Sequence, residues 1–109
     1  MKLGIFTVST PEWTPDEVFS SLKRIGYDGI EWRVCEDKGD RAQPSFWSGN
    51  RTTMTAAEII ERAGELKSKA RAAGLQMPSL GAYINCLQKE MILPHLKATA
   101  AIGAHCVRI

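Results

Sequence analysis

The sequence has few cysteines and no pattern that pairs them. Cys35, Cys86 and Cys106 are far apart and form no Cys-x-x-Cys pair. Neither a disulfide framework nor a structural zinc site is therefore indicated, and we expect the thiols to be reduced. His105 precedes Cys106, but neighbouring residues of a strand point to opposite faces, so we expect a small buried thiol rather than a nucleophile.

Basic clusters and long apolar runs are also missing. Of the 109 residues, 14 are Lys or Arg and 12 are Asp or Glu, and no run of basic residues alternates with aromatics. We therefore expect no nucleic-acid partner. Gly4, Thr7 and Ser9 interrupt the apolar residues at the start of the chain, and no later segment is long enough to span a membrane. These observations predict a cytoplasmic globular protein with no membrane partner.

A helical pattern, a glycine and a short apolar stretch recur three times along the chain. Gly26, Gly74 and Gly103 open the segments GYDGIEW, GLQMPSL and GAHCVRI. Apolar residues at helical spacing precede the glycines, and a glycine directly after the last of them is a common helix stop. The repeat therefore predicts three units in which a helix leads into a strand.

Two of the helix starts also repeat. The sequences TPDE at 14–17 and TAAE at 55–58 each place a threonine at the N-cap and a glutamate at the third helical position. This is the pattern of a capping box, in which the two side chains hydrogen-bond each other's backbone N–H groups. The two motifs predict helices over about Pro15 to Ile25 and about Ala56 to Ala73.

The third helix is less regular than the other two. Residues Asn85 to Gln88 could cap it, but Pro94 lies within its apolar pattern, so the helix is either kinked or begins near Leu93. With a first strand at Leu3 to Val8 and a last strand around Val107 to Ile109, strands and helices alternate along the chain. Such alternation predicts a parallel sheet with right-handed crossovers.

Two architectures are compatible with a parallel sheet. The segment Ser9 to Trp13, which follows the first strand, contains neither G-x-G-x-x-G nor a Walker sequence, so a doubly wound nucleotide-binding fold is disfavoured. We predict an α/β fold whose parallel βαβ units form the first four strands of a (β/α)8 TIM barrel, incomplete in this chain. Residues 1–109 would be the N-terminal portion of one barrel domain, since a complete barrel has roughly 250 residues.

The second predicted strand alternates apolar and charged side chains in the sequence IEWRV, residues 30–34. In a barrel its apolar residues face the helices, whereas Glu31 and Arg33 point inward near the strand end, where active sites form. Ser79 and Arg108 occupy the same repeat position as Glu31 and should also point inward. Because an unpaired buried charge is costly, the inward charges must form a salt-bridge layer or meet a polar substrate, and both alternatives are open.

Four segments of the chain resemble, in order and register, the opening of the sugar phosphate isomerase/epimerase group within the xylose isomerase-like TIM barrels. They are MKLGIFTVS, LKRIGYDGIEW, LKSKARAAGLQMPSL and ATAAIGAHCVRI. The resemblance covers nearly the whole chain except the loop between Cys35 and Thr53. It implies a divalent metal (Mn, Mg, Zn or Co), a sugar or sugar phosphate as substrate, and proton transfer through an enediolate with carboxylates as acid and base.

The chain also departs from this group. The resemblance implies that the metal ligands come from the second half of the barrel, so no ligand is assigned here and no metal is expected for this chain alone. The related endonuclease IV branch has metal histidines in its first half, near a stretch that Gly81 to Asn85 resembles. No histidine precedes that stretch here, His95 is expected to be a solvated helix residue, and His105 starts the last strand. A DNA-repair enzyme is therefore the weakest alternative.

A long loop at about residues 35–54 follows the second strand, on the side of the sheet where barrel active sites form. Loops of this length are commonly functional lids or disordered segments. This loop contains Phe46 and Trp47, and disordered segments are poor in aromatics. We therefore predict a lid or a subunit contact rather than disorder.

These observations predict Glu31, Arg33, Trp47 and Tyr83 as substrate-binding residues, with no catalytic or metal-ligand residue assigned. Glu31 is the only acid at a barrel-facing strand end, and Arg33 is its expected partner. The predicted function is the N-terminal part of a metal-dependent sugar (phosphate) isomerase or epimerase, inactive as this chain alone. The alternative is a stand-alone half-barrel that binds or assembles. If the 109 residues are all that folds, the open edge strands predict a homo-oligomer.

Overall fold

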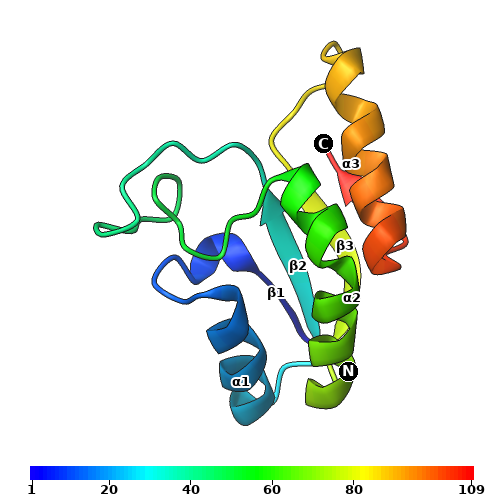
Figure 1. Cartoon of the computed structure of the whole chain (residues 1–109). Coiled ribbons are helices and arrows are strands. Elements are labelled where there is room, and N and C mark those ends of the chain that lie inside the picture. Colours follow the sequence, from blue (N-terminus) through cyan, green and yellow to red (C-terminus); the bar gives the residue numbers. More distant parts are fainter.

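The computed structural model covers residues 1–109 and contains four parallel strands that alternate with three α-helices (Figure 1). The strands lie in the order β1-β2-β3-β4. The elements are β1 (Gly4–Phe6), the 3-10 helix η1 (Thr7–Ser9), α1 (Pro15–Ile25), β2 (Gly29–Val34), α2 (Ala56–Ala73), β3 (Gln76–Ala82), α3 (Lys89–Ile102) and β4 (Cys106–Arg108). The predicted α/β class and parallel pairing are confirmed. None of the helices combines the length and apolar character that a membrane span requires.

Helices α1 and α2 begin at the predicted capping boxes. The hydroxyl of Thr14 accepts from the N–H of Glu17 at 3.3 Å, and the Glu17 carboxylate accepts from the N–H of Thr14 at 2.7 Å. Thr55 and Glu58 form the same reciprocal pair at 3.1 and 2.7 Å. Each box satisfies N–H groups that the first turn of a helix leaves without a helical partner. The predicted bounds of both helices are confirmed.

All three helices end at the repeated glycines. Gly26, Gly74 and Gly103 have φ angles of 95, 70 and 74°, and the N–H of each returns to a carbonyl of the preceding turn. This left-handed conformation is open to glycine at little cost, because glycine has no Cβ to clash with the backbone. The repeat of helix, glycine and strand is therefore a repeat of the same helix-ending motif.

The first strand is shorter than predicted. The expectation of a strand over Leu3 to Val8 is wrong at its end, because the chain turns into η1 at Thr7. Thr7 is fully buried, and its hydroxyl accepts the N–H of Arg33 at 2.9 Å. Its carbonyl oxygen accepts from the N–H and the hydroxyl of Thr10, each at 3.1 Å. The side chain of Thr7 thus takes the place of a backbone partner for β2.

The third helix begins at Lys89 and continues through Pro94. Of the two predicted alternatives, a kinked helix or a start near Leu93, the start near Leu93 is wrong. The polar turn before it closes on itself, since the side chain of Gln88 accepts the N–H of Asn85 at 2.9 Å. The missing N–H of a proline removes one helical hydrogen bond. Further along the helix, Ala98, Thr99 and Ile102 are buried.

The hydrophobic core lies between the sheet and the helices. Figure 1 shows α1, α2 and α3 on one side of the sheet. Ile30, Trp32 and Val34 of β2 are fully buried in the core cluster, together with residues of all three helices. Trp32 donates its indole N–H to the sulfur of Met77 at 3.1 Å and packs edge-on against Phe19. The predicted orientation of the apolar residues of β2 toward the helices is confirmed.

The other face of the sheet, termed here the inner face, carries the charged residues of β2. In the strand register Glu31 pairs with Ser79, and Ser79 pairs with Cys106, whereas Arg108 pairs with Gly81. Arg108 therefore lies two residues beyond the position that the repeat predicted for it. Because side chains alternate with a period of two, the shift leaves Arg108 on the predicted face.

Candidate functional site

A charged cluster crosses the inner face from β2 to β4. One carboxylate oxygen of Glu31 accepts from Arg108 Nη2 at 2.7 Å and Nε at 3.1 Å, and the other accepts from the hydroxyl of Ser79 at 2.8 Å. The Arg108 guanidinium also lies 4.7 Å from the ring centre of Phe6. The prediction that Arg33 partners Glu31 is wrong. The longer-range partner Arg108 takes this role because its side chain reaches back over β3.

A glycine makes this crossing possible. A Cβ atom at Gly81 would collide with the ring of Phe6, the carboxylate of Glu31 and the guanidinium of Arg108. Any larger residue at this position would therefore displace the three side chains from one another. In the sequence, Gly81 is distinguished only as part of the segment that follows the second repeat. The three side chains that leave no room for a Cβ atom at Gly81 come from β1, β2 and β4.

Arg33 forms a second, separate cluster with the loop after β2. Its Nη1 donates to Asp37 at 2.9 Å and to the hydroxyl of Thr53 at 2.6 Å, and its Nη2 donates to the carbonyl of Trp47 at 3.0 Å. The side chains of Arg33 and Asp37 are only 5% and 2% exposed. The guanidinium lies 4.9 Å from the ring centre of Tyr83, and its Nε has no hydrogen-bond partner.

Asp37 organises the loop at about residues 35–54. Its carboxylate accepts the backbone N–H groups of Gly39, Gly49 and Asn50 at 2.8–3.0 Å in addition to Arg33. Burial raises the pKa of Asp37, but these hydrogen bonds to its charged form outweigh that effect and lower the pKa to about 2. The carboxylate is thus ionised throughout the neutral range. Sequence reasoning missed Asp37, for which the only signal is its position two residues before Gly39.

The loop is anchored to the end of β1 rather than hanging free. The side chain of Asn50 donates to the carbonyls of Val8 and Phe46 at 3.2 Å, and the Thr52 hydroxyl donates to the carbonyl of Thr7 at 2.9 Å. Asn50 and Thr52 are fully buried. The base of the loop is therefore an ordered part of the sheet end, and the role of its tip as a lid or subunit contact stays a prediction.

Three aromatic rings line the inner face where the strands end. The rings of Phe6 and Tyr83 stack with centres 6.4 Å apart, and Trp47 meets Tyr83 edge-on at 6.1 Å. Trp47 and Tyr83 are 64% and 43% exposed. The predicted residues Arg33, Trp47 and Tyr83 thus meet in one place, and Glu31 adjoins them through Phe6. Phe6 itself was not predicted, although it alternates with the outward Ile5.

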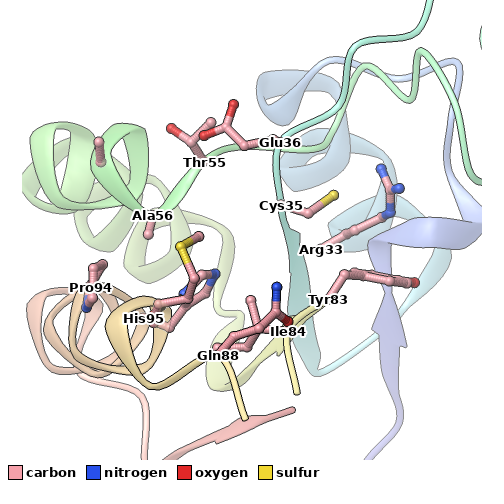
Figure 2. Close-up of a pocket in the computed structure, with 12 residues that line it drawn as sticks. Arg33, Cys35, Glu36, Thr55, Ala56, Tyr83, Ile84, Gln88, Pro94 and His95 are labelled. Carbon is pink, nitrogen blue, oxygen red and sulfur yellow. Dashed lines mark hydrogen bonds between the residues drawn. The ribbon is translucent and has the colours of Figure 1, made fainter. Parts of the chain in front are cut away.

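A pocket of about 450 Å³ adjoins this cluster, between the ends of β2 and β3 and the first halves of α2 and α3 (Figure 2). Arg33 and Tyr83 line it from the sheet, and His95 lines it from α3. The prediction of a solvated His95 is wrong, because this side of α3 packs toward α2 and leaves the residue 3% exposed. Burial raises the pKa of the Cys35 thiol, which also lines the pocket.

All three cysteines are free. The prediction of a buried thiol at Cys106 is wrong, because its strand lies at the edge of the sheet and its inner face has no covering layer. Cys86 is exposed and Cys35 is half-buried. His105 directly precedes β4, at whose start it was predicted, and it is exposed.

No group of three or more His, Cys, Asp or Glu side chains converges on one point. Both carboxylate oxygens of Glu31 already accept hydrogen bonds from Ser79 and Arg108.

Comparison of the chain with protein-family models, with curated proteins and with solved structures gives no match.

Proposed function

We propose that this chain forms the N-terminal, sugar-binding part of a metal-dependent sugar (phosphate) isomerase or epimerase with a (β/α)8 barrel. The observation that carries the proposal is the group of aromatic rings beside paired charges at the strand ends, on the face away from the helices. Four parallel strands in sequential order, with all helices on one side, match the first half of such a barrel.

The side chains at this face suit the recognition of a sugar. Exposed rings of Trp47 and Tyr83 can pack against the carbon–hydrogen surface of a sugar ring, because an aromatic ring combines apolar area with a polar edge. Glu31 and Arg108 can exchange part of their mutual hydrogen bonding for sugar hydroxyls. Both are more accessible than the Arg33–Asp37 pair. The geometry therefore favours binding roles for these residues.

The chemical step requires groups that this chain does not assemble. Moving a proton beside a carbonyl needs a positioned base and an electrophile that stabilises the enediolate. Both carboxylate oxygens of Glu31 already accept hydrogen bonds, one from the Arg108 guanidinium and the other from the Ser79 hydroxyl. In this proposal the base and the metal ligands come from strands that complete the barrel, and the 109-residue chain has no isomerase activity.

Tryptophan fluorescence provides the test of sugar binding. The chain has three tryptophans, of which Trp32 is fully buried, Trp13 is half-buried and Trp47 is exposed beside Tyr83. Titration with hexoses and hexose phosphates should change the emission of the native chain and of Trp13→Phe, but not of Trp47→Phe. If no sugar in either series changes the Trp47 signal, the proposal is wrong.

A stand-alone half-barrel is the second candidate. It is favoured by the sheet edges, because β1 and β4 each have only one neighbouring strand and the inner face has no second layer. Two copies could pair the β4 edge of one with the β1 edge of the other and close an eight-stranded parallel barrel. Sedimentation should then show a dimer. A compact monomer at micromolar concentration would contradict this candidate without affecting sugar binding.

A further inference from the structure

The pocket between the strand ends and the helices has properties that the proposed sugar site does not use. Its volume of about 450 Å³ falls within the range of small-molecule sites, roughly 300–1,000 Å³. Its walls combine polar groups with carbon surface from Ile84, Met91 and Tyr83. Figure 2 shows Tyr83, Ile84 and His95 around a common space between the sheet and the two helices.

His95 has an unsatisfied nitrogen at this pocket. Its Nδ1 lies 2.8 Å from the carbonyl oxygen of Met91, and a carbonyl can only accept, so Nδ1 carries a proton. The other ring nitrogen, Nε2, is buried and has no partner. Figure 2 shows the ring reaching from α3 toward the pocket. A buried polar atom without a partner is costly, and a bound group at Nε2 would satisfy it.

The first turn of α2 brings backbone donors to the same pocket. Ala56 and Ala57, which line it, are the first two helical residues, and their N–H groups make no hydrogen bond. By contrast, Thr55 and Glu58 on either side are satisfied by the capping box. Free N–H groups and the positive end of the helix dipole favour an anion at this position.

Gln88 adds a side-chain donor from the turn before α3. Its carbonyl oxygen accepts the N–H of Asn85 at 2.9 Å, which leaves its amide NH₂ group available at the pocket. Glu36 is the one acidic side chain in the lining, and it lies exposed at the rim, where water screens its charge. The donors thus outnumber the acceptors around the pocket.

We propose that this pocket binds the phosphate group of a small phosphate ester. The N–H groups of the first turn of α2 and the amide of Gln88 donate to the phosphate oxygens, and Nε2 of His95 accepts from a phosphate hydroxyl. The apolar wall holds the carbon part of the ester. This site deepens the proposed function by assigning a phosphate position, but its binding chemistry does not depend on isomerase activity.

Imidazole NMR of the native chain tests the proposal, because the protein has two histidines in opposite environments. Inorganic phosphate and a hexose phosphate should shift the ring signals of buried His95, while those of exposed His105 stay unchanged. The corresponding neutral hexose and an equal ionic strength of chloride should leave His95 unchanged. Equal shifts of both histidines, or a His95 response to chloride, would show a nonspecific effect and overturn the proposal.

Two variants remove donors without touching the buried core. Ala56→Pro removes an N–H group at a position where the chain already tolerates proline, since α1 starts with Thr14 and Pro15 in the equivalent places. Thr55 already has the extended conformation that a following proline requires. Gln88→Ala removes the side-chain amide. Each change should weaken phosphate binding about tenfold, the loss of one hydrogen bond to a charged group.

The matched control is Gln76→Ala, which removes an exposed glutamine from the opposite end of β3. It should leave phosphate binding unchanged. Native affinity in both Ala56→Pro and Gln88→Ala would overturn the pocket proposal even if sugars bind near Trp47. A response of His95 to phosphate without any Trp47 response to sugars would support the pocket and reject the proposed function.

Discussion

The two faces of the sheet follow different physical rules. On the face toward the helices, Trp32 and its neighbours on β2 are fully buried among apolar side chains. On the inner face of the same strand, Glu31 and Arg33 each bind specific hydrogen-bonding partners. Apolar packing accepts many partners of suitable size, whereas a charged group needs a particular one. The difference teaches that apolar packing stabilises one face, whereas specific polar partners order the other.

The inner face is itself divided by exposure. The Arg33–Asp37 pair is almost completely buried, whereas Arg108 in the pair with Glu31 is more than half exposed. A buried pair loses much stability when one partner is removed, while an exposed pair contributes little. The buried pair therefore holds the loop in place, and the exposed pair can respond to a ligand.

The largest loss of stability is expected from a substitution on the apolar face of the sheet. Trp32→Ala removes a fully buried side chain and should lower the free energy of unfolding by about 3–5 kcal/mol. Trp47→Ala, the matched change on the inner face, removes an exposed ring and should cost less than about 1 kcal/mol. Urea unfolding followed by circular dichroism measures both. Similar losses for the two variants would show that the faces do not differ as described.

The second effect concerns the loop anchor. Asp37→Asn leaves Arg33 buried without its counter-charge and sets an amide against backbone donors, so it should cost roughly 2–3 kcal/mol. Limited proteolysis within residues 35–54 should become faster. Asp40→Asn, a change at an exposed aspartate of the same loop, serves as the control.

Because the pKa of Asp37 is lowered in the folded chain, its contribution to the free energy of unfolding should depend on pH. Its folded pKa of about 2 lies below the reference value of 3.8, so the stabilisation is complete above the unfolded pKa. It is lost as pH falls from about 4 toward 2 and amounts to about 2 kcal/mol. The Asp37→Asn variant should lose less stability over this range than the native chain. Parallel acid unfolding curves would contradict the assignment.

The third effect distinguishes two glycines. Gly81→Ala pushes a methyl group into the side chains of Phe6, Glu31 and Arg108 and should cost about 1–3 kcal/mol. Gly64→Ala places its methyl group in open space on α2 and should instead stabilise the protein by about 0.5–1 kcal/mol. Thermal unfolding should therefore show a lower Tm for Gly81→Ala and a higher Tm for Gly64→Ala, which would sharpen the contrast between the crowded inner face and the helix surface.

The smallest effect on stability should accompany a large effect on binding. Glu31→Gln weakens an accessible ion pair and should cost less than about 1 kcal/mol. If the inner face binds sugars, the same change should abolish the fluorescence response of Trp47. Glu61→Gln, on the exposed side of α2, should change neither property. An unaltered sugar response in Glu31→Gln would leave the pair with Arg108 as a structural contact only.

The sequence by itself determined α1 and α2, the glycine ends of all three helices and the apolar face of β2. Thr14 with Glu17, and Thr55 with Glu58, act over three residues, and each repeated glycine ends its own helix. Local hydrogen bonds and the period-two alternation of β2 need no knowledge of distant residues. For this reason the bounds of α1 and α2 agree with the prediction, and so does the burial of Trp32.

Only the tertiary structure decided the partners of the polar residues. Arg108 reaches Glu31 across 77 positions of sequence, and Asp37 rather than Glu31 holds Arg33. His95 is buried because the side of α3 that carries it faces α2. The helical pattern of the sequence does not by itself predict which side of α3 faces α2. Strand register and helix rotation are set by packing over the whole chain, and a shift of two residues changes the partner of a charge without changing its face.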